Sequence, residues 1–254
     1  MDPAQDRRRF FLADPLAESP SLRPEEERHA AKVIRLEPGD RILGLDGQGG
    51  LHPLVLRKSV RGKLEFERDG EPLREPPPGS AGSPIGWIEV AVPLPKGARA
   101  EAMLERLTQL GIAALRPLDC ARNQGFERES AESRGPRLER ACLEACKQSR
   151  RSWMPKIHPT ARPEDLRGLL AGRRCALLSP GAERTLLHWS EAQDAGPTVV
   201  IAGPEGGFTD QELASLDFAT PLVLAPHILR IETAVEAAVS TLVQVSYARG
   251  LRSG

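Results

Sequence analysis

The feature of this sequence that most restricts its fold is an alternation, after residue 84, of short apolar runs with amphipathic stretches. The apolar runs lie at 85–94, 112–118, 175–179, 198–202 and 221–225. Short, continuously apolar runs are typical of strands buried on both faces in a parallel sheet. Helical periodicity separates them, over 98–110 before Gly111, over 138–148, and over 232–249 before Gly250. The alternation predicts an α/β fold with a mainly parallel sheet.

The residues before this region have a different pattern. Short strands are predicted at 41–46, 51–58 and 63–67, after a short helix over 25–35, and Asp46–Gly50 is typical of a hairpin loop. Pro53 should weaken the second strand or place it at an edge. Strands this short, separated by turn residues, favour a small β-barrel.

Residues 72–84 contain five prolines, which disfavour both a helix interior and a sheet ladder. We therefore expect a linker there, between a first domain over 1–76 and a second over 77–254.

Charge and composition limit the classes of protein. Lys and Arg number 35, as do Asp and Glu, so any nucleic-acid face must come from uneven placement of charge. Residues 96–174 hold 17 basic and 10 acidic side chains, whereas residues 175–254 hold 4 and 9. No apolar run reaches the roughly 18 residues of a membrane span, and the first residues lack the apolar core of a secretory signal. Four cysteines in a chain of this length do not indicate a disulfide framework. We expect a cytoplasmic protein without a membrane partner.

The most informative local motif is IAGPEGGF at 201–208, where a predicted buried strand enters a glycine-rich turn. Glycines allow left-handed dihedrals and a close approach of the backbone to a ligand. Ligands of open α/β sheets bind at the carboxyl ends of strands. Thr209 and Glu212 then form the pattern of a capping box. The spacing matches neither GxGxxG nor a Walker loop, which disfavours a dinucleotide or a triphosphate; a tight connection without a ligand is the alternative.

Two further segments carry charge in suggestive places. LAPHILRIETA at 224–234 puts Arg230 and Glu232 just before the last predicted helix, either as an ion pair at the helix start or as a charged pair at a pocket rim. KQSRRSWMP at 147–155 places three basic side chains near Trp153, where they could hold a phosphate or a base, or stabilise a helix C-terminus. The basic segment Arg7–Arg9 has the same two interpretations.

Several other kinds of site are not indicated. Cys142 and Cys146 lie four residues apart without a second close Cys/His pair, so we expect small core residues and no metal site. HExxH and GxSxG are absent from the sequence, and the histidines are scattered.

Together these segments resemble the RsmE family, which methylates N3 of a uridine in 16S ribosomal RNA of the small subunit using S-adenosylmethionine. The resemblance runs nearly end to end, through RRFFL, HAAKVIRLEPGD, LGLDGQG, PLPKGARAEAMLERLTQLGI, KQSRRSWMPKI, IAGPEGGFTDQE and LAPHILRIETA. Ala225, His227 and Ile231 stand where the family usually has Gly, Arg and Thr.

The resemblance implies a fold and an assembly. It implies a PUA-like β-barrel that grips RNA, followed by a SPOUT-type α/β domain with a trefoil knot, working as a homodimer. Pattern analysis alone would not propose a knot. The implied partner is small-subunit ribosomal RNA or the assembled 30S particle.

The resemblance also implies site residues. The cofactor loops map onto Leu178, Ser179, Ile201, Ala202, Gly203, Pro204, Glu205, Gly206, Gly207, Leu224, Ala225, Ile228, Leu229 and Thr233. We expect RNA contacts from Arg7, Arg8, Arg9, Arg35, Lys147, Arg150 and Arg151. The predicted catalytic pair is Arg230 and Glu232: Arg230 would stabilise negative charge developing on the uracil carbonyls, and Glu232 would position Arg230.

Other functions stay open at this point. The chain could be another SPOUT RNA methyltransferase, acting on a different base or on a ribose 2′-hydroxyl. It could also be a non-catalytic RNA-binding or ribosome-assembly protein. A small-molecule methyltransferase would not need the basic middle segment or the first domain.

Overall fold

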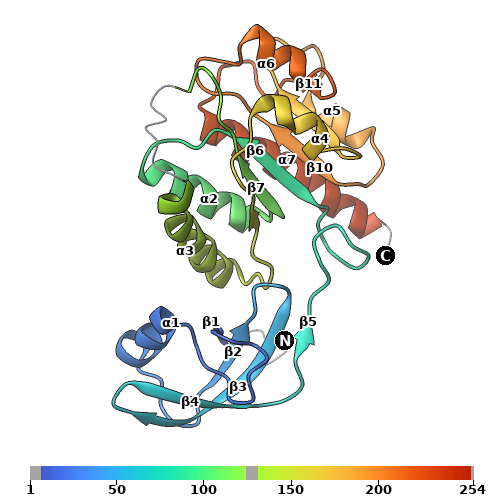
Figure 1. Ribbon diagram of the computed structural model, residues 1–254. Coiled ribbons are helices and arrows are strands. Elements are labelled where there is room, and N and C mark those ends of the chain that lie inside the picture. Colours follow the sequence, from blue (N-terminus) through green and yellow to red (C-terminus); the bar gives the residue numbers. More distant parts are fainter. Residues whose placement is uncertain (1–6, 124–130, 253–254) are drawn as a thin grey trace. The chain divides into compact units, whose positions relative to one another are not determined.

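The computed structural model describes residues 7–123 and 131–252, which form two compact units (Figure 1). One unit takes in the chain up to Pro77 together with Cys146–Met154, and the other takes in Pro78–Ala145 and the chain from Pro155 onward. The segment Cys146–Met154 therefore belongs to the first unit, although the sequence suggested that this unit ends near residue 76.

The first unit is built on a five-stranded sheet. Its strands are β1 (Arg8–Phe11), β2 (Arg41–Leu45), β3 (Gly50–Val60), β4 (Lys63–Arg68) and β5 (Leu73–Arg74). The order is β1-β2-β3-β4, with β5 also paired to β3. The apolar side chains on one face of the sheet pack against the helical segment between β1 and β2. Together they form the core of the unit, which includes Phe10, Ile42, Leu54 and Phe66.

That helical segment changes type along its length. It begins as the α-helix α1 (Pro24–His29), continues as the π-helical turn η1 (Ala30–Ile34), and ends at Arg35 with a left-handed φ of 56°. The predicted helix over 25–35 is thus confirmed, with a wider turn in its second half.

Two expectations for this unit hold only in part. Pro53 lies inside β3, the central strand, opposite Leu43 of β2. Pro53 lies between the part of β3 that pairs with β4 and the part that pairs with β5. Its carbonyl accepts from the N–H of Asp69, and the N–H that proline lacks would face this gap in the ladder. The stretch expected to be a linker, 72–84, does contain the division between the two units, after Pro77. Its first residues nevertheless form β5, whose Leu73 pairs with Leu51 of β3.

The second unit is an α/β layer structure around a six-stranded parallel sheet, as predicted. The strands are β6 (Ile88–Val92), β7 (Ala114–Pro117), β8 (Lys156–Ile157), β9 (Arg174–Leu178), β10 (Thr198–Ile201) and β11 (Thr220–Leu222). Their order is β11-β9-β10-β6-β7-β8. The two middle strands, β10 and β6, are buried at every position, which explains their mostly apolar sequence; Thr198 and Glu89 are the buried polar exceptions.

Helices cover both faces of this sheet. The longer ones are α2 (Ala98–Leu110), α3 (Ala131–Ser149) and α7 (Ile231–Arg252), and the shorter ones are η2 (Pro163–Asp165), α4 (Leu166–Leu169), α5 (Leu186–Glu191) and α6 (Asp210–Ser215). α7 packs along α2 and α5 (Figure 1). Leu166 and Leu216 belong to the buried core on the opposite face of the sheet. The helix α2 ends at Gly111 with a φ of 103°, as predicted, but α7 continues through Gly250, which we expected to end it.

One side of α7 carries an apolar stripe that is buried inside the unit. Val235, Ala238 and Val239 are fully buried within the unit, and Leu242 nearly so. The stripe is therefore part of the core rather than an exposed interface.

Candidate active site

A pocket of about 850 Å³ opens where three parallel strands end. Its wall consists of residues that follow β9, β10 and β11 and of the start of α7. A pocket of this size suits a small-molecule ligand, and the carboxyl edge of a parallel sheet is the usual place for one. The lining is predominantly apolar, with Arg99, Glu205, His227 and Arg230 as its titratable members.

Most of the sequence-predicted cofactor residues line this one pocket. Those that do are Leu178, Ser179, Ala202, Gly203, Pro204, Glu205, Gly207, Leu224, Ala225, Ile228 and Leu229. Three others do not: Ile201 is a buried strand residue, Gly206 lies against Arg122, and Thr233 is exposed on the first turn of α7. Sequence reasoning missed several apolar wall residues, namely Leu177, Pro180, Phe208, Leu213, Leu222, Val223, Ile231 and Ala234.

The glycines of the turn after β10 serve different purposes. Gly207 has a φ of +70°, and its N–H donates to the carbonyl of Pro204 at 2.8 Å, which closes the turn. Gly203 has no left-handed φ; a Cβ there would stand 2.9 Å from the Phe208 ring. A side chain larger than hydrogen at Gly203 would therefore displace Phe208 from the pocket wall.

The capping box after this turn is confirmed and does more than cap α6. The Glu212 carboxylate accepts from the N–H of Thr209 at 2.7 Å and from the N–H of Ala121 at 2.8 Å. Burial alone would raise the pKa of Glu212, but these backbone donors outweigh it and hold that pKa below its usual value. Arg122 donates to the carbonyls of Gly206 and Phe208. Ala121 and Arg122, in the loop after β7, thus stabilise the glycine-rich turn and the start of α6 by hydrogen bonds.

The charged pair expected between Arg230 and Glu232 has a different form. Glu232 accepts from Arg99 through both oxygens, at 2.9 and 3.0 Å, and Arg99 also lies 3.5 Å from Glu205. Burial would raise the pKa of Glu232, but the backbone N–H and Arg99 hold it below its usual value. The hydrogen-bond partner of Glu232 is therefore Arg99, whereas Arg230 interacts with Glu232 through its charge.

The side chain of Arg230 has no hydrogen-bond or ion-pair partner among the described residues, although its charge helps to lower the pKa of Glu232. Arg230 lines the pocket, and its carbonyl accepts from the N–H of Ala234 at 2.8 Å. Neighbouring Ile228 is 87% exposed at the same rim. A guanidinium in this position can still donate to a ligand.

Arg99 is the functional residue that sequence reasoning overlooked. The sequence shows only that Arg99 follows a predicted strand and lies in the first turn of the next helix; that β6 lies beside β10 is known from the sheet order. The residue after one strand end lies near the residues after the next.

The predicted RNA-binding residues all belong to the first unit, and several already have partners there. Arg7 pairs with Asp69 at 3.2 Å, Lys147 pairs with the buried Glu26 at 2.7 Å, and Arg9 donates to the carbonyl of Arg150. Arg151 is half-buried, and the exposed members of the set are Arg8, Arg35 and Arg150.

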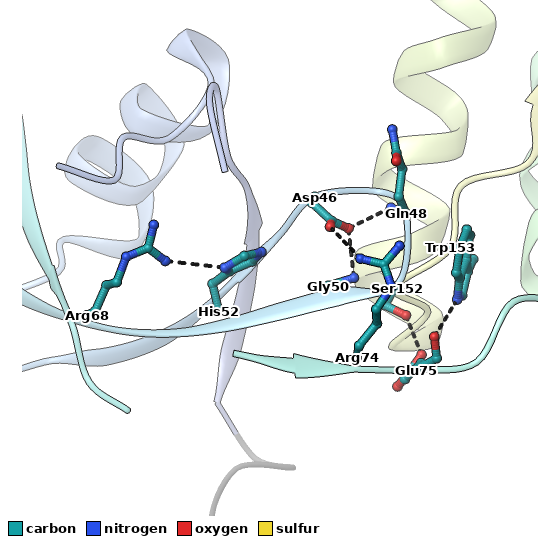
Figure 2. A network of polar contacts seen from close by, with 9 residues as sticks. All are labelled: Asp46, Gln48, Gly50, His52, Arg68, Arg74, Glu75, Ser152 and Trp153. Carbon is teal, nitrogen blue, oxygen red and sulfur yellow. Dashed lines mark hydrogen bonds and ion pairs between the residues drawn. The ribbon is translucent and has the colours of Figure 1, made fainter. Parts of the chain in front are cut away.

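The Trp153 side chain also has interaction partners inside the first unit (Figure 2). Its indole N–H donates to the carbonyl of Glu75 at 3.1 Å, and the guanidinium of Arg74 lies 5.8 Å from its ring centroid. Gly49 lies so close that a Cβ there would come within 2.5 Å of the indole. The Trp153 side chain therefore joins Cys146–Met154 to the sheet, which limits its use as a base-stacking platform.

Other kinds of site are not found in the part of the chain that the structure covers. Among residues 7–123 and 131–252, no group of three or more His, Cys, Asp or Glu side chains could hold a metal ion. No described helix is both long and apolar enough to cross a membrane.

Comparisons of the sequence and of the fold both find methyltransferases among known proteins. Residues 82–243 match the model of an RNA methyltransferase domain. The chain is 30% identical over 229 residues to ribosomal RNA small subunit methyltransferase E of Mycobacterium bovis, covering 86% of this chain and 83% of that one. The Synechocystis protein of the same name is 29% identical, over 87% of this chain and 72% of its own.

Solved structures share the fold over nearly the whole chain. A putative methyltransferase from Legionella pneumophila, solved with S-adenosylmethionine, superposes with a TM-score of 0.78 at 22% identity, covering 96% of this chain and 98% of that one. A ribosomal RNA small subunit methyltransferase E from Neisseria gonorrhoeae, also bound to S-adenosylmethionine, gives 0.74 at 24% identity over 96% and 98%.

Proposed function

Because the chain belongs to the ribosomal RNA small subunit methyltransferase E family, we propose that it uses S-adenosylmethionine to methylate N3 of a uridine in 16S ribosomal RNA. The observation that carries the proposal is the pocket of about 850 Å³, formed where β9, β10 and β11 end. The PUA-like character of the first unit, the trefoil knot, the homodimer and the cytoplasmic location are further parts of the proposal, and they rest on the family resemblance.

The pocket residues suit S-adenosylmethionine, which lacks phosphate. Leu178, Leu224 and Leu229 would hold the adenosine by apolar contact. Gly203, which has no side chain, leaves room for the Phe208 ring in the pocket wall. The lining includes no lysine, consistent with a ligand that needs no phosphate-binding side chain. When bound, this cofactor supplies an electrophilic methyl group on a sulfonium.

Arg230 is the residue proposed to act on the uracil. N3 must lose its proton before or during attack, and negative charge then develops on the flanking carbonyl oxygens. A donor that is already in place stabilises such charge without reorganisation. The side chain of Arg230 has no hydrogen-bond partner among the described residues and lines the pocket, so it can donate to these oxygens. The rest of the catalysis is alignment of N3 with the methyl group.

Recognition of RNA is assigned to the first unit. Its exposed basic residues Arg8, Arg35 and Arg150 can contact phosphates. The uridine must be unstacked to expose N3, so we expect a single-stranded segment or a loop as the target.

The test uses small subunits purified from a strain that lacks this gene. They are incubated with the protein and labelled S-adenosylmethionine, and the RNA is digested to nucleosides for mass spectrometry. Labelled N3-methyluridine is the expected product. Detection of another methylated base or of a 2′-O-methylribose would instead show an RNA methyltransferase of a different specificity. Saturable RNA binding without saturable cofactor binding would indicate a non-catalytic RNA-binding protein.

A further inference from the structure

Arg99 lies between two carboxylates that come from different segments of the pocket wall. One is Glu232, on the first turn of α7, and the other is Glu205, at the centre of the turn that follows β10. Arg99 itself lines the pocket from the first turn of α2. A single guanidinium thus joins the starts of two helices to the glycine-rich turn.

The two ion pairs of Arg99 are not equivalent. The contact with Glu232 uses Nε and Nη2 on the two carboxylate oxygens, and the Glu232 side chain is only 14% exposed. The contact with Glu205 is a single one at 3.5 Å, and Glu205 is 69% exposed. Bidentate pairs fix a guanidinium in orientation as well as in position. Glu232 therefore fixes Arg99, and Nη2 of Arg99, which donates to Glu232, also contacts Glu205.

We propose that Arg99 is a positioning residue of the cofactor pocket. Anchored on Glu232, it holds Glu205 and thereby keeps the Gly-Pro-Glu-Gly-Gly turn in the form that accepts the methyl donor. The inference rests on the proposed function, because it concerns the same pocket and the same cofactor. Its effect falls on cofactor affinity, since Arg99 acts through Glu205 and the turn.

The chain contains a matched control for this role. Arg106, on the same helix α2, forms an ion pair with Glu236 of α7 at 2.8 Å. Arg106 and Arg99 are 47% and 45% exposed, so the two pairs join the same helices from similarly exposed arginines. Arg106 and Glu236 do not line the pocket. A role limited to joining α2 and α7 would apply to both pairs.

The experiment compares wild type, Arg99→Gln, Arg99→Lys, Glu205→Gln and Arg106→Gln by calorimetric titration with S-adenosylmethionine. Thermal unfolding and single-turnover methylation at saturating cofactor are measured alongside. We expect Arg99→Gln to raise the cofactor Kd about tenfold, as for the loss of one charge-assisted hydrogen bond. Arg99→Lys should recover only part of the affinity, because an ammonium cannot reproduce the bidentate contact. Arg106→Gln should leave the Kd unchanged.

Further measurements separate positioning from general stability. Arg99→Gln and Arg106→Gln should lower the Tm by similar small amounts, and Arg106→Gln should also leave the single-turnover rate at saturating cofactor near that of wild type. The double variant Arg99→Gln/Glu205→Gln should bind no more weakly than Arg99→Gln, because both changes remove the same contact.

The inference is overturned if Arg99→Gln binds the cofactor as tightly as wild type, or if Arg106→Gln weakens binding to the same extent. In either case wild type still binds, and the proposed function stands. A wild-type protein without saturable cofactor binding would instead contradict the proposed function, and the inference with it.

Discussion

Gly203 lies directly against the ring of Phe208, so closely that a Cβ built on Gly203 would stand 2.9 Å from two of the ring carbons. Both residues line the pocket, at opposite ends of the turn that follows β10. The contact explains why the first glycine of this turn is needed although its φ lies outside the left-handed region. The packing of the pocket wall, rather than the backbone dihedral, excludes a side chain there.

The substitution Gly203→Ala tests this contact. The new methyl group must push Phe208 out of place, because real Cβ atoms do not approach a ring this closely. We expect the displaced ring to lower cofactor affinity by about tenfold. The overpacking itself should lower the free energy of unfolding by roughly 1–3 kcal/mol. Calorimetric titration measures the affinity. Gly168→Ala, where a Cβ meets nothing within 4 Å, is the control and should bind normally. Unchanged cofactor affinity in Gly203→Ala would show that Phe208 can shift without weakening cofactor binding, and would contradict the prediction.

Arg230→Ala tests the proposed stabilisation of charge on the uracil. Removal of one preorganised donor typically lowers the rate by ~10²–10³. We expect a loss of this size in single-turnover methylation at saturating RNA and cofactor, with cofactor affinity little changed. If the saturated rate stays close to that of wild type, Arg230 does not stabilise the transition state.

The local parts of this structure were the ones that sequence could predict. The helix over 98–110 follows from the spacing of Met103, Leu104 and Leu107, all fully buried against the sheet, and from Gly111 behind it. The capping box of Thr209 and Glu212 is a four-residue pattern. The ends of β9 and β10, at Leu178 and Ile201, lie within one residue of the predicted ends, because Pro180 and Gly203 follow closely. β11, by contrast, ends at Leu222, before the predicted end at 225.

The parts that sequence could not predict depend on partners far along the chain. Lys147 was interpreted as a helix-terminal cation or a phosphate ligand, but its partner is Glu26, 121 residues away. Glu232 was paired with its near neighbour Arg230, whereas the observed partner Arg99 is 133 residues distant. Charge patterns reveal neighbours on one element, and the sheet order decides which elements meet.

The Arg99–Glu232 pair predicts a specific dependence of stability on pH. The folded-state pKa of Glu232 is lowered from 4.5, against the effect of burial, by its own backbone N–H and by Arg99. A carboxyl with a lowered pKa stabilises the fold fully above its unfolded-state pKa, and the contribution is lost as pH falls through the folded-state value. Glu232→Gln should therefore reduce the free energy of unfolding by about 1 kcal/mol at neutral pH.

The measurement is urea unfolding of wild type and Glu232→Gln from pH 7 down to pH 3. We expect the difference between the two proteins to begin to shrink below about pH 4.5 and to disappear in stronger acid. Glu205→Gln, which removes a 69% exposed carboxylate, should differ little from wild type throughout. A gap between wild type and Glu232→Gln that stays constant down to pH 3 would rule out the ion pair as its cause.

Glu89 is the group whose loss should destabilise the second unit most. Its carboxylate is fully buried in β6, accepts from Arg116 Nε at 2.8 Å, contacts Arg173, and lies 3.9 Å from His158 Nε2. Glu89→Gln leaves two guanidinium groups without a counter-charge, and breaking a buried pair in this way costs about 3–5 kcal/mol.

The matched control for Glu89 is Asp217→Asn, which breaks the exposed pair of Asp217 with Arg167 in the same unit. That change should cost no more than about 1 kcal/mol, because exposed pairs are screened by solvent. Urea unfolding of both variants at pH 7 measures the difference. Equal losses in the two variants would mean that burial adds nothing to the Glu89 cluster, and that the sheet tolerates an uncompensated charge at its centre.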